Sequence, residues 1–223
     1  MKLYHGSNHI ISHPTFGKGK KYNDYGRGFY CTESIDMAKE WAVAENRSGF
    51  ANCYELDESG LSVLYLNSEE YNTLHWLTIL LQNRTFDLDS VLATEARDYL
   101  IKNYYIDLRK YDLIRGYRAD DSYFSFAQDF LNGTISYRQL TNAMHLGRLG
   151  EQVMIKSRRA FGQISFVGYE IADYEDYFIK RQIRDRNARK QYFDLERNRR
   201  RKDDLFIVHI LDEEVRPDDA RLR

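Results

Sequence analysis

Residues 25–34, with the sequence Tyr-Gly-Arg-Gly-Phe-Tyr-Cys-Thr-Glu-Ser, constrain the fold more than any other segment of the chain. The two glycines allow positive φ values and let another molecule approach the backbone closely. The apolar residues that follow predict a short strand, and the apolar spacing up to Trp41 predicts a helix that Thr32 or Ser34 caps. A turn, a strand and a helix in this order can bring Tyr30 and Trp41 to one cleft, although both residues are also typical of an ordinary core.

The composition indicates a folded chain located in the cytoplasm. At 223 residues it suits one domain, or one domain with an appendage, and its 14% aromatic residues and 2 prolines exclude a linker-rich protein. The formal charge of -1 provides no overall attraction to nucleic acid or membrane. Cys31 and Cys53 are too few for a disulfide framework and lack zinc spacing, so we expect a reducing compartment and no metal. Neither a signal-peptide core nor an apolar run of membrane-spanning length occurs, so we expect no membrane contact.

Short strands are predicted before and after the glycine segment. Residues 2–4 predict a strand that stops at His5-Gly6-Ser7, where uncovered backbone groups can bond a ligand carboxamide; an ordinary turn is the alternative. Residues 10–25 are polar and rich in glycine and lysine, which predicts a mobile loop. Residues 51–56 predict another strand, and residues 61–66 predict its partner after a turn.

These motifs together resemble a known superfamily. The chain is similar to the NAD-binding half of ADP-ribosyltransferases of the diphtheria-toxin and poly-ADP-ribose-polymerase type. Three features carry the similarity, in this order: His5-Gly6-Ser7, the Gly-Arg-Gly-Phe-Tyr run that ends at Tyr30, and an aromatic residue at position 41. Those enzymes carry a His-Tyr-Glu triad on a split, curved antiparallel sheet, and Glu151 opens a late apolar run where the third member is expected. Over residues 2–170 the chain also resembles a bacterial family of uncharacterised domains with this fold, which begins Leu-Tyr-His-Gly-Ser and later carries an Ala-Asp-Asp segment.

The resemblance implies an α+β fold with an ADP-ribosyltransferase-like split antiparallel β-sheet, and NAD as the co-substrate. Tyr30 and Trp41 would stack on the nicotinamide ring, the backbone of Gly6 would bond its carboxamide, and His5 would bond a ribose hydroxyl on the adenosine side. Trp41 stands where relatives usually have tyrosine, and Ala38 stands where polymerases of this type have a carboxamide-binding serine. The full set of expected NAD-binding residues is His5, Gly6, Ser7, Gly28, Tyr30 and Trp41.

The resemblance also assigns the catalytic carboxylate. Breaking the nicotinamide–ribose bond of NAD develops positive charge on the ribose, as in glycoside hydrolysis, so the site needs a nearby carboxylate. Glu151 would fill this role, with His5 and Tyr30 as the other members of the triad. A solvated surface acid is the alternative for Glu151, and Gln152 follows it where relatives have an aromatic residue.

The middle of the chain is an insertion relative to the toxin pattern. Within residues 67–111, apolar stripes at 76–81 and 88–99 predict helices that pack on the sheet, and residues 137–146 predict another helix. In related enzymes the loop before the catalytic glutamate selects the acceptor, so the resemblance assigns target choice to residues 145–150.

Four charged residues at positions 115–121 allow more than one interpretation. Asp120 and Asp121 lack a third metal ligand at suitable spacing, and Asp121 is predicted to cap a helix over residues 122–131. Arg115 and Arg118 either pair with these acids or contact the NAD pyrophosphate or the target, and the sequence leaves these alternatives open.

Residues 174–202 predict a strongly basic helix, because from position 180 onward it carries eleven positive and three negative side chains. The stripe can be a solvated surface or can face nucleic acid, with Tyr192 and Phe193 available for stacking on bases. The candidate nucleic-acid contacts are Arg197, Arg199, Arg200 and Arg201. After this helix, residues 206–211 predict a strand that is either buried or available to a binding partner. Residues 212–223 predict a frayed end.

We therefore expect residues 1–172 to form an ADP-ribosyltransferase-like domain, with its helical insertion at about 67–111, and residues 173–223 to form a basic helical extension. The expected function is transfer of ADP-ribose from NAD to a macromolecule, either RNA or DNA or a protein, by a bacterial toxin or defence-type effector with an inhibitory partner such as an antitoxin. The alternatives are NAD hydrolysis and a binding module that has this fold without turnover.

Overall fold

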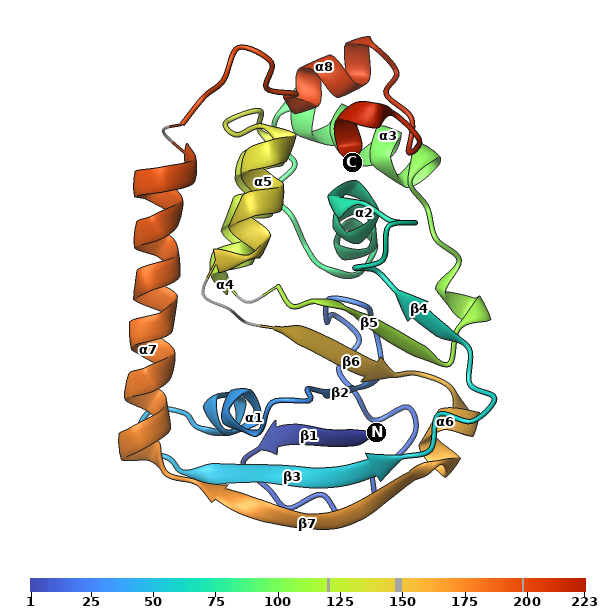
Figure 1. Cartoon of the computed structure of the whole chain (residues 1–223), viewed down its shortest axis with the longest axis vertical. Helices are drawn as coiled ribbons and strands as arrows, with labels where there is room; N and C mark the ends of the chain where they lie inside the picture. Colours follow the sequence, from blue (N-terminus) through green and yellow to red (C-terminus); the bar gives the residue numbers. More distant parts are fainter. Residues whose placement is uncertain (120, 147–149, 198) are drawn as a thin grey trace.

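Two β-sheets stacked on each other form the centre of the computed structural model, which describes residues 1–119, 121–146, 150–197 and 199–223, without the side chains of 121–123 and 195–197 (Figure 1). Sheet A is antiparallel, with the order β1-β3-β7: β1 (Lys2–Ser7), β3 (Gly49–Leu56) and β7 (Ile164–Ala172). Sheet B has the order β2-β6-β5-β4: β2 (Phe29–Cys31), β6 (Glu151–Ile155), β5 (Leu113–Tyr117) and β4 (Val63–Tyr65). With helices on both sheets, the predicted α+β class is confirmed.

The two sheets meet at one point, between the edge strands β1 and β2. There the backbones of Tyr4 and Thr32 exchange hydrogen bonds of 2.8 and 2.9 Å. Buried apolar side chains from both sheets, including Leu3 and Val153, fill the space between them. The bridge therefore joins two sheets that separate on either side of it.

One pairing differs from the prediction. Residues 61–66 were expected to pair with the strand 51–56, but β4 runs parallel to β5 and belongs to sheet B. β3 instead lies between β1 and β7 and has both of its edges satisfied, so it has no edge left for β4. All other strand pairs in the described chain are antiparallel.

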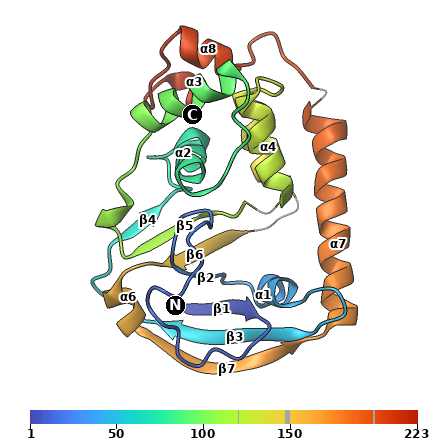
Figure 2. The same ribbon diagram turned by 180° about the vertical axis from the view of Figure 1, so that it is seen from behind.

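A helical layer covers the face of sheet B that points away from sheet A (Figures 1 and 2). It contains α2 (Thr73–Asn83), α3 (Val91–Asn103), α4 (Asp121–Leu131) and α5 (Tyr137–Met144), and short helices η1 (Leu108–Lys110) and α6 (Arg158–Gly162) lie in connections. Capping boxes begin α2 at Asn72 and α5 at Ser136. Asp121, predicted to cap α4, is instead the first residue of that helix, and Asp120 lies outside the described residues.

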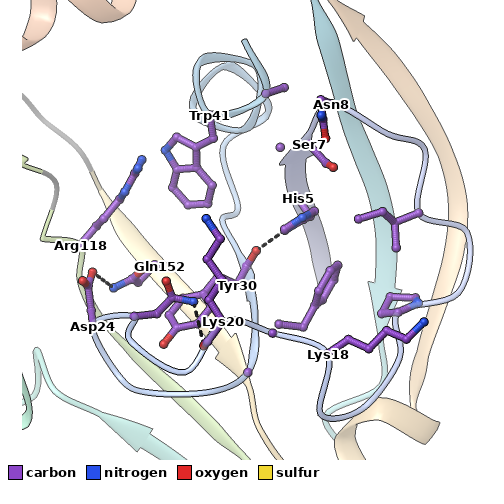
Figure 3. A pocket seen from close by; sticks show the side chains of 18 of the residues that line it. His5, Ser7, Asn8, Lys18, Lys20, Asp24, Tyr30, Trp41, Arg118 and Gln152 are labelled. Atoms are coloured by element: carbon purple, nitrogen blue, oxygen red, sulfur yellow. Dashed lines mark hydrogen bonds between the residues drawn. The ribbon is translucent and has the colours of Figure 1, made fainter. Parts of the chain in front are cut away.

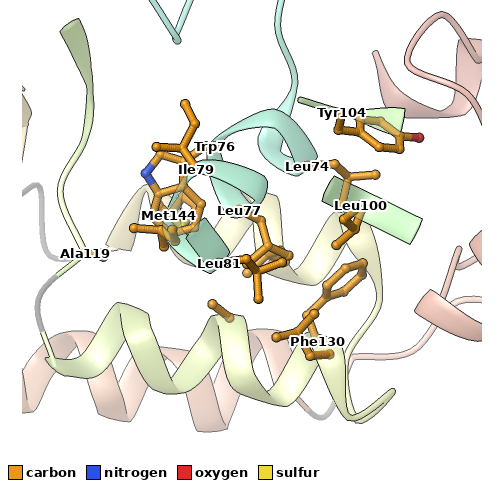
Figure 4. Packing of buried hydrophobic residues seen from close by; sticks show 14 of the residues in the cluster. Leu74, Trp76, Leu77, Ile79, Leu81, Leu100, Tyr104, Ala119, Phe130 and Met144 are labelled. Carbon is orange, nitrogen blue, oxygen red and sulfur yellow. The ribbon is translucent and has the colours of Figure 1, made fainter. Parts of the chain in front are cut away.

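The main hydrophobic core lies between this helical layer and sheet B. Figure 4 shows Trp76 and Leu77 of α2 among side chains from α3, α4 and α5. The Trp76 indole donates to the Tyr117 carbonyl over 3.1 Å, which joins α2 to the end of β5. The insertion at 67–111 thus supplies helices that pack on the sheet, as predicted.

Helix α1 (Ile35–Ala42) packs on β1 and β3 and carries Trp41 near its end. Ser34 caps it by accepting a hydrogen bond from the Met37 amide, which confirms one of the two predicted caps. Gly6 of β1 makes this packing possible, since a Cβ there would lie 2.0 Å from the carbonyl oxygen of Ala38. The helix therefore lies directly on the strand.

The segment between β1 and β2 forms neither a helix nor a strand, as predicted, and Figure 2 shows it crossing from sheet A to sheet B. The fully buried Asn52 of β3 fixes its start, because its amide bonds the His5 and His9 carbonyls and its oxygen accepts from the Ile11 amide. The Tyr54 hydroxyl donates to the Ile11 carbonyl at 2.5 Å. These bonds hold the loop against β3.

The C-terminal region departs most from the prediction. The long helix α7 (Tyr174–Gln191) is followed by a π-helical turn (Tyr192–Arg197), so the predicted helix over 174–202 ends earlier. Tyr192, expected to be available for stacking on bases, is buried: its ring stacks on Phe126 at 3.8 Å and its hydroxyl donates to Asp129. The end of α7 is therefore anchored on α4.

Residues 206–211, predicted as a strand, form the helix α8 (Ile207–Asp212). A short apolar run does not distinguish the two forms, and here Ile207 and Ile210 lie on one helical face against the main core. The predicted frayed end is also wrong, since Val215 and Leu222 are buried and the short helix η4 (Ala220–Leu222) closes the described chain. No helix in the described ranges is long and apolar enough to cross a membrane.

Candidate active site

A pocket of about 900 Å³ opens beside β1, β2 and α1, under the loop that connects the two strands (Figure 3). All six residues predicted to bind NAD line it: His5, Gly6, Ser7, Gly28, Tyr30 and Trp41. Residues distant in the sequence thus meet in one cavity, whose volume is typical of a small-molecule site.

His5 is held as a neutral hydrogen-bond acceptor. Its Nδ1 lies 2.6 Å from the Tyr30 carbonyl oxygen, and its ring packs at 4.4 Å from that of Phe29. Because a carbonyl can only accept, Nδ1 carries the proton and Nε2 is left as the acceptor. Burial lowers the pKa of His5 below its ordinary value, which favours this neutral form at pH 7.

The strand β1 continues through Ser7, so His5-Gly6-Ser7 is not the predicted turn after a strand. The pairing with β3 nevertheless leaves one edge of β1 open, because β1 is the edge strand of sheet A. Tyr4 directs its amide and carbonyl away from β3, toward Thr32. Since these directions alternate along a strand, the amide and carbonyl of Gly6 point the same way, toward the gap between the sheets.

Tyr30 and Trp41 line the pocket from different elements (Figure 3). The Tyr30 hydroxyl donates to the Gly26 carbonyl at 2.6 Å and accepts from the Tyr25 amide at 3.0 Å, so the ring is fixed at the glycine turn. The Arg118 guanidinium lies 4.4 Å from the centre of the Trp41 ring. The Trp41 Nε1 is buried and has no hydrogen-bond partner among the described residues, which leaves one donor for a ligand.

Glu151 lies at the start of β6, as predicted, but its side chain does not line the pocket, whereas that of Gln152 does. Successive side chains of a strand point to opposite faces, which separates these two neighbours. The Glu151 carboxylate accepts a hydrogen bond of 2.7 Å from Asn67 and lies 3.5 Å from Arg115, whose guanidinium also pairs with Glu33 at 2.7 Å. Glu151 therefore belongs to a charged cluster at the strand end, beside the pocket.

Basic side chains surround the pocket. Among the described residues of the lining, Asp24 is the one carboxylate; it pairs with Arg84 at 3.0 Å and accepts hydrogen bonds from the Gln152 side chain and the Ala119 amide. Burial raises the pKa of Asp24 in spite of these partners. The basic lining residues are Lys18, Lys20, Arg47, Arg84, Arg118 and Arg181.

Residues 1–166 match the sequence model of a family described as "Protein of unknown function (DUF3990)". The chain belongs to this family. No curated protein and no solved structure matches the chain significantly.

The DUF3990 match ends before α7, although α7 contributes Arg181 to the pocket lining. Sequence analysis missed this residue, as it missed the lysines of the loop and Arg47. The sequence did show a lysine-rich loop and a basic helix, but the spacing of these residues along the chain did not indicate that both segments face one cavity.

Of the four arginines proposed to contact nucleic acid, the three with described side chains lie outside the pocket. Arg197 ends the π-helical turn and its side chain is outside the described residues. Arg199, Arg200 and Arg201 are exposed in the connection that leads to α8, where Arg138 donates to the Arg199 carbonyl. These three described arginines are not part of the pocket lining. Within the loop 145–150, expected to select the acceptor, residues 147–149 lie outside the described residues.

Proposed function

We propose that this DUF3990 member is an NAD-dependent ADP-ribosyltransferase that modifies a macromolecule and needs no metal. The observation that supports it best is one pocket whose lining combines the aromatic rings of Tyr30 and Trp41 with several cations, of which Arg118 lies over the Trp41 ring. NAD combines a flat aromatic ring with a negatively charged pyrophosphate, and such a lining complements both.

The chain's own groups supply specific roles in this proposal. Gly6 would bond the carboxamide through its outward-pointing backbone groups, and the Nε2 of neutral His5 would accept from a ribose hydroxyl. Gly28 lets the pocket wall before β2 lie close against β6, because a Cβ there would lie 2.6 Å from Met154 Cγ. Stacking of the nicotinamide on the Arg118 side of the Trp41 ring would require that guanidinium to move.

Glu151 would stabilise the positive charge that develops on the ribose when the nicotinamide bond breaks. It lies next in sequence to the pocket residue Gln152, and Asn67 and Arg115 fix its carboxylate. A ribose at the edge of the pocket toward the start of β6 would meet this carboxylate. In this proposal, which follows the sequence resemblance, the protein is a bacterial toxin or defence-type effector whose acceptor is a protein or a nucleic acid.

The test is incubation of the purified protein with NAD labelled in its ADP-ribose part, alone and with cell lysate. We expect label to become attached to a macromolecule in the lysate, and treatment of the lysate with nuclease or protease then identifies the acceptor class. Release of free ADP-ribose without attachment would indicate NAD hydrolysis. Unchanged NAD under every condition would leave a binding module and contradict the proposal.

Replacement of Trp41 tests the nicotinamide end. Trp41→Ala is expected to weaken NAD binding by roughly 0.5–1.5 kcal/mol beyond the effect of lost contact area, because a stacking face is removed, whereas Trp41→Tyr keeps that face. The chain has two tryptophans, and the other, Trp76, is buried in the core. NAD should therefore quench tryptophan fluorescence in the wild type but not in Trp41→Phe. Equal quenching in both proteins would place the ring elsewhere.

A further inference from the structure

Two arginines of the pocket lining carry charge that the described part of the chain does not neutralise. Arg47 and Arg181 form no ion pair with any described carboxylate, unlike Arg84, which pairs with Asp24 in the same lining. Both residues are exposed to solvent, and guanidinium groups that line one concave site attract an anion to it. A guanidinium also matches the geometry of a phosphate through paired hydrogen bonds.

Arg47 is held in place by a tight turn after α1. Ala44 and Arg47 exchange two backbone hydrogen bonds of 3.1 and 3.0 Å. Asn46, between them, adopts φ +55°, a left-handed conformation that asparagine tolerates better than most residues. The turn therefore fixes the backbone from which the Arg47 side chain reaches the pocket.

Arg181 is held in place because α7 is docked on α1. One turn further along α7, Arg184 forms a 2.8 Å ion pair with Glu40 of α1, and only 15% and 10% of these two side chains is exposed. At the start of α7, the Tyr177 hydroxyl donates to Asp36 at 3.1 Å. Residues three apart share a helix face, so this docking directs Arg181 toward the cavity.

We propose that Arg47 and Arg181 form a phosphate-binding subsite of this pocket, for the pyrophosphate of a dinucleotide. The inference rests on the proposed function and extends it, because it makes α7 a wall of the donor site although α7 lies outside the family match. On this basis Arg181 of α7 binds the nucleotide and does not need a nucleic-acid target to explain its charge.

The test compares ligands with and without phosphates. Binding of NAD, ADP-ribose and nicotinamide is measured by calorimetry for the wild type, Arg181→Gln and Arg47→Gln. Loss of one charge-assisted contact is worth about 1.5–3 kcal/mol, so we expect each variant to bind NAD and ADP-ribose roughly 10- to 100-fold more weakly. The affinity for nicotinamide should stay unchanged, because it carries no phosphate.

Arg186→Gln is the matched control. It removes the same charge from the exposed surface of α7 at a residue that does not line the pocket. If Arg181→Gln and Arg47→Gln bind NAD as tightly as the wild type, the subsite is overturned. It is also overturned if Arg186→Gln loses as much NAD affinity as these two variants, because the loss would then reflect only the change of net charge. A wild type that binds none of the three ligands would overturn the proposed function and the subsite together.

Discussion

Replacing Glu151 with glutamine is expected to slow ADP-ribose transfer by roughly 10²–10³-fold while NAD binding is retained. Glutamine keeps the shape of the side chain and its ability to accept from Asn67, but it removes the negative charge. Only the charge stabilises a developing cation, so the effect should appear in the rate of transfer and not in the affinity. Single-turnover rates with labelled NAD, together with calorimetric affinities, measure the two separately.

Glu33→Gln is the control for this experiment. Glu33 also contacts Arg115, at 2.7 Å, so its replacement changes the charge of the same cluster by the same amount. If Glu151 acts directly on the ribose, Glu33→Gln should transfer at a rate close to the wild type. A Glu151→Gln variant that transfers at the wild-type rate would remove Glu151 from the mechanism.

Removing Arg184 is expected to lower the free energy of unfolding by about 3–5 kcal/mol. Arg184→Met leaves the Glu40 carboxylate largely buried between α1 and α7 without its 2.8 Å partner. A buried carboxylate without a partner lowers the free energy of unfolding much more than the loss of a surface ion pair does. Urea unfolding of the variant should show a lower midpoint with a similar slope.

Two further variants separate this effect from a general loss of charge. Arg189→Met breaks the exposed pair of Arg189 with Asp185 on the same helix and should change stability by less than about 1 kcal/mol. Glu40→Leu combined with Arg184→Met removes both charges and should recover most of the loss. If the single variants at 184 and 189 are equally stable, α7 is not anchored through Glu40.

Local signals in the sequence predicted the elements that carry the candidate site. The glycine turn, β2 and the Ser34-capped α1 form as expected, since a positive-φ glycine and a cap depend on neighbouring residues only. Gly26 adopts φ +84° at the turn, and Glu151 begins β6. The six residues expected to bind NAD also line one pocket, while their roles remain predictions.

The turn–strand–helix unit and the start of β6 could be predicted because short-range preferences decide both, whereas the α+β class was expected from the family resemblance. The folded structure was needed to show that β4 joins sheet B, that residues 207–212 are helical, and that residues near 222 are buried, since each depends on burial against distant residues. It also decided that cations from the loop, the turn after α1 and α7 face one cavity, and that Glu151 lies beside it. Side-chain direction and charge pairing across elements arise from packing, and residue spacing along the chain does not encode them.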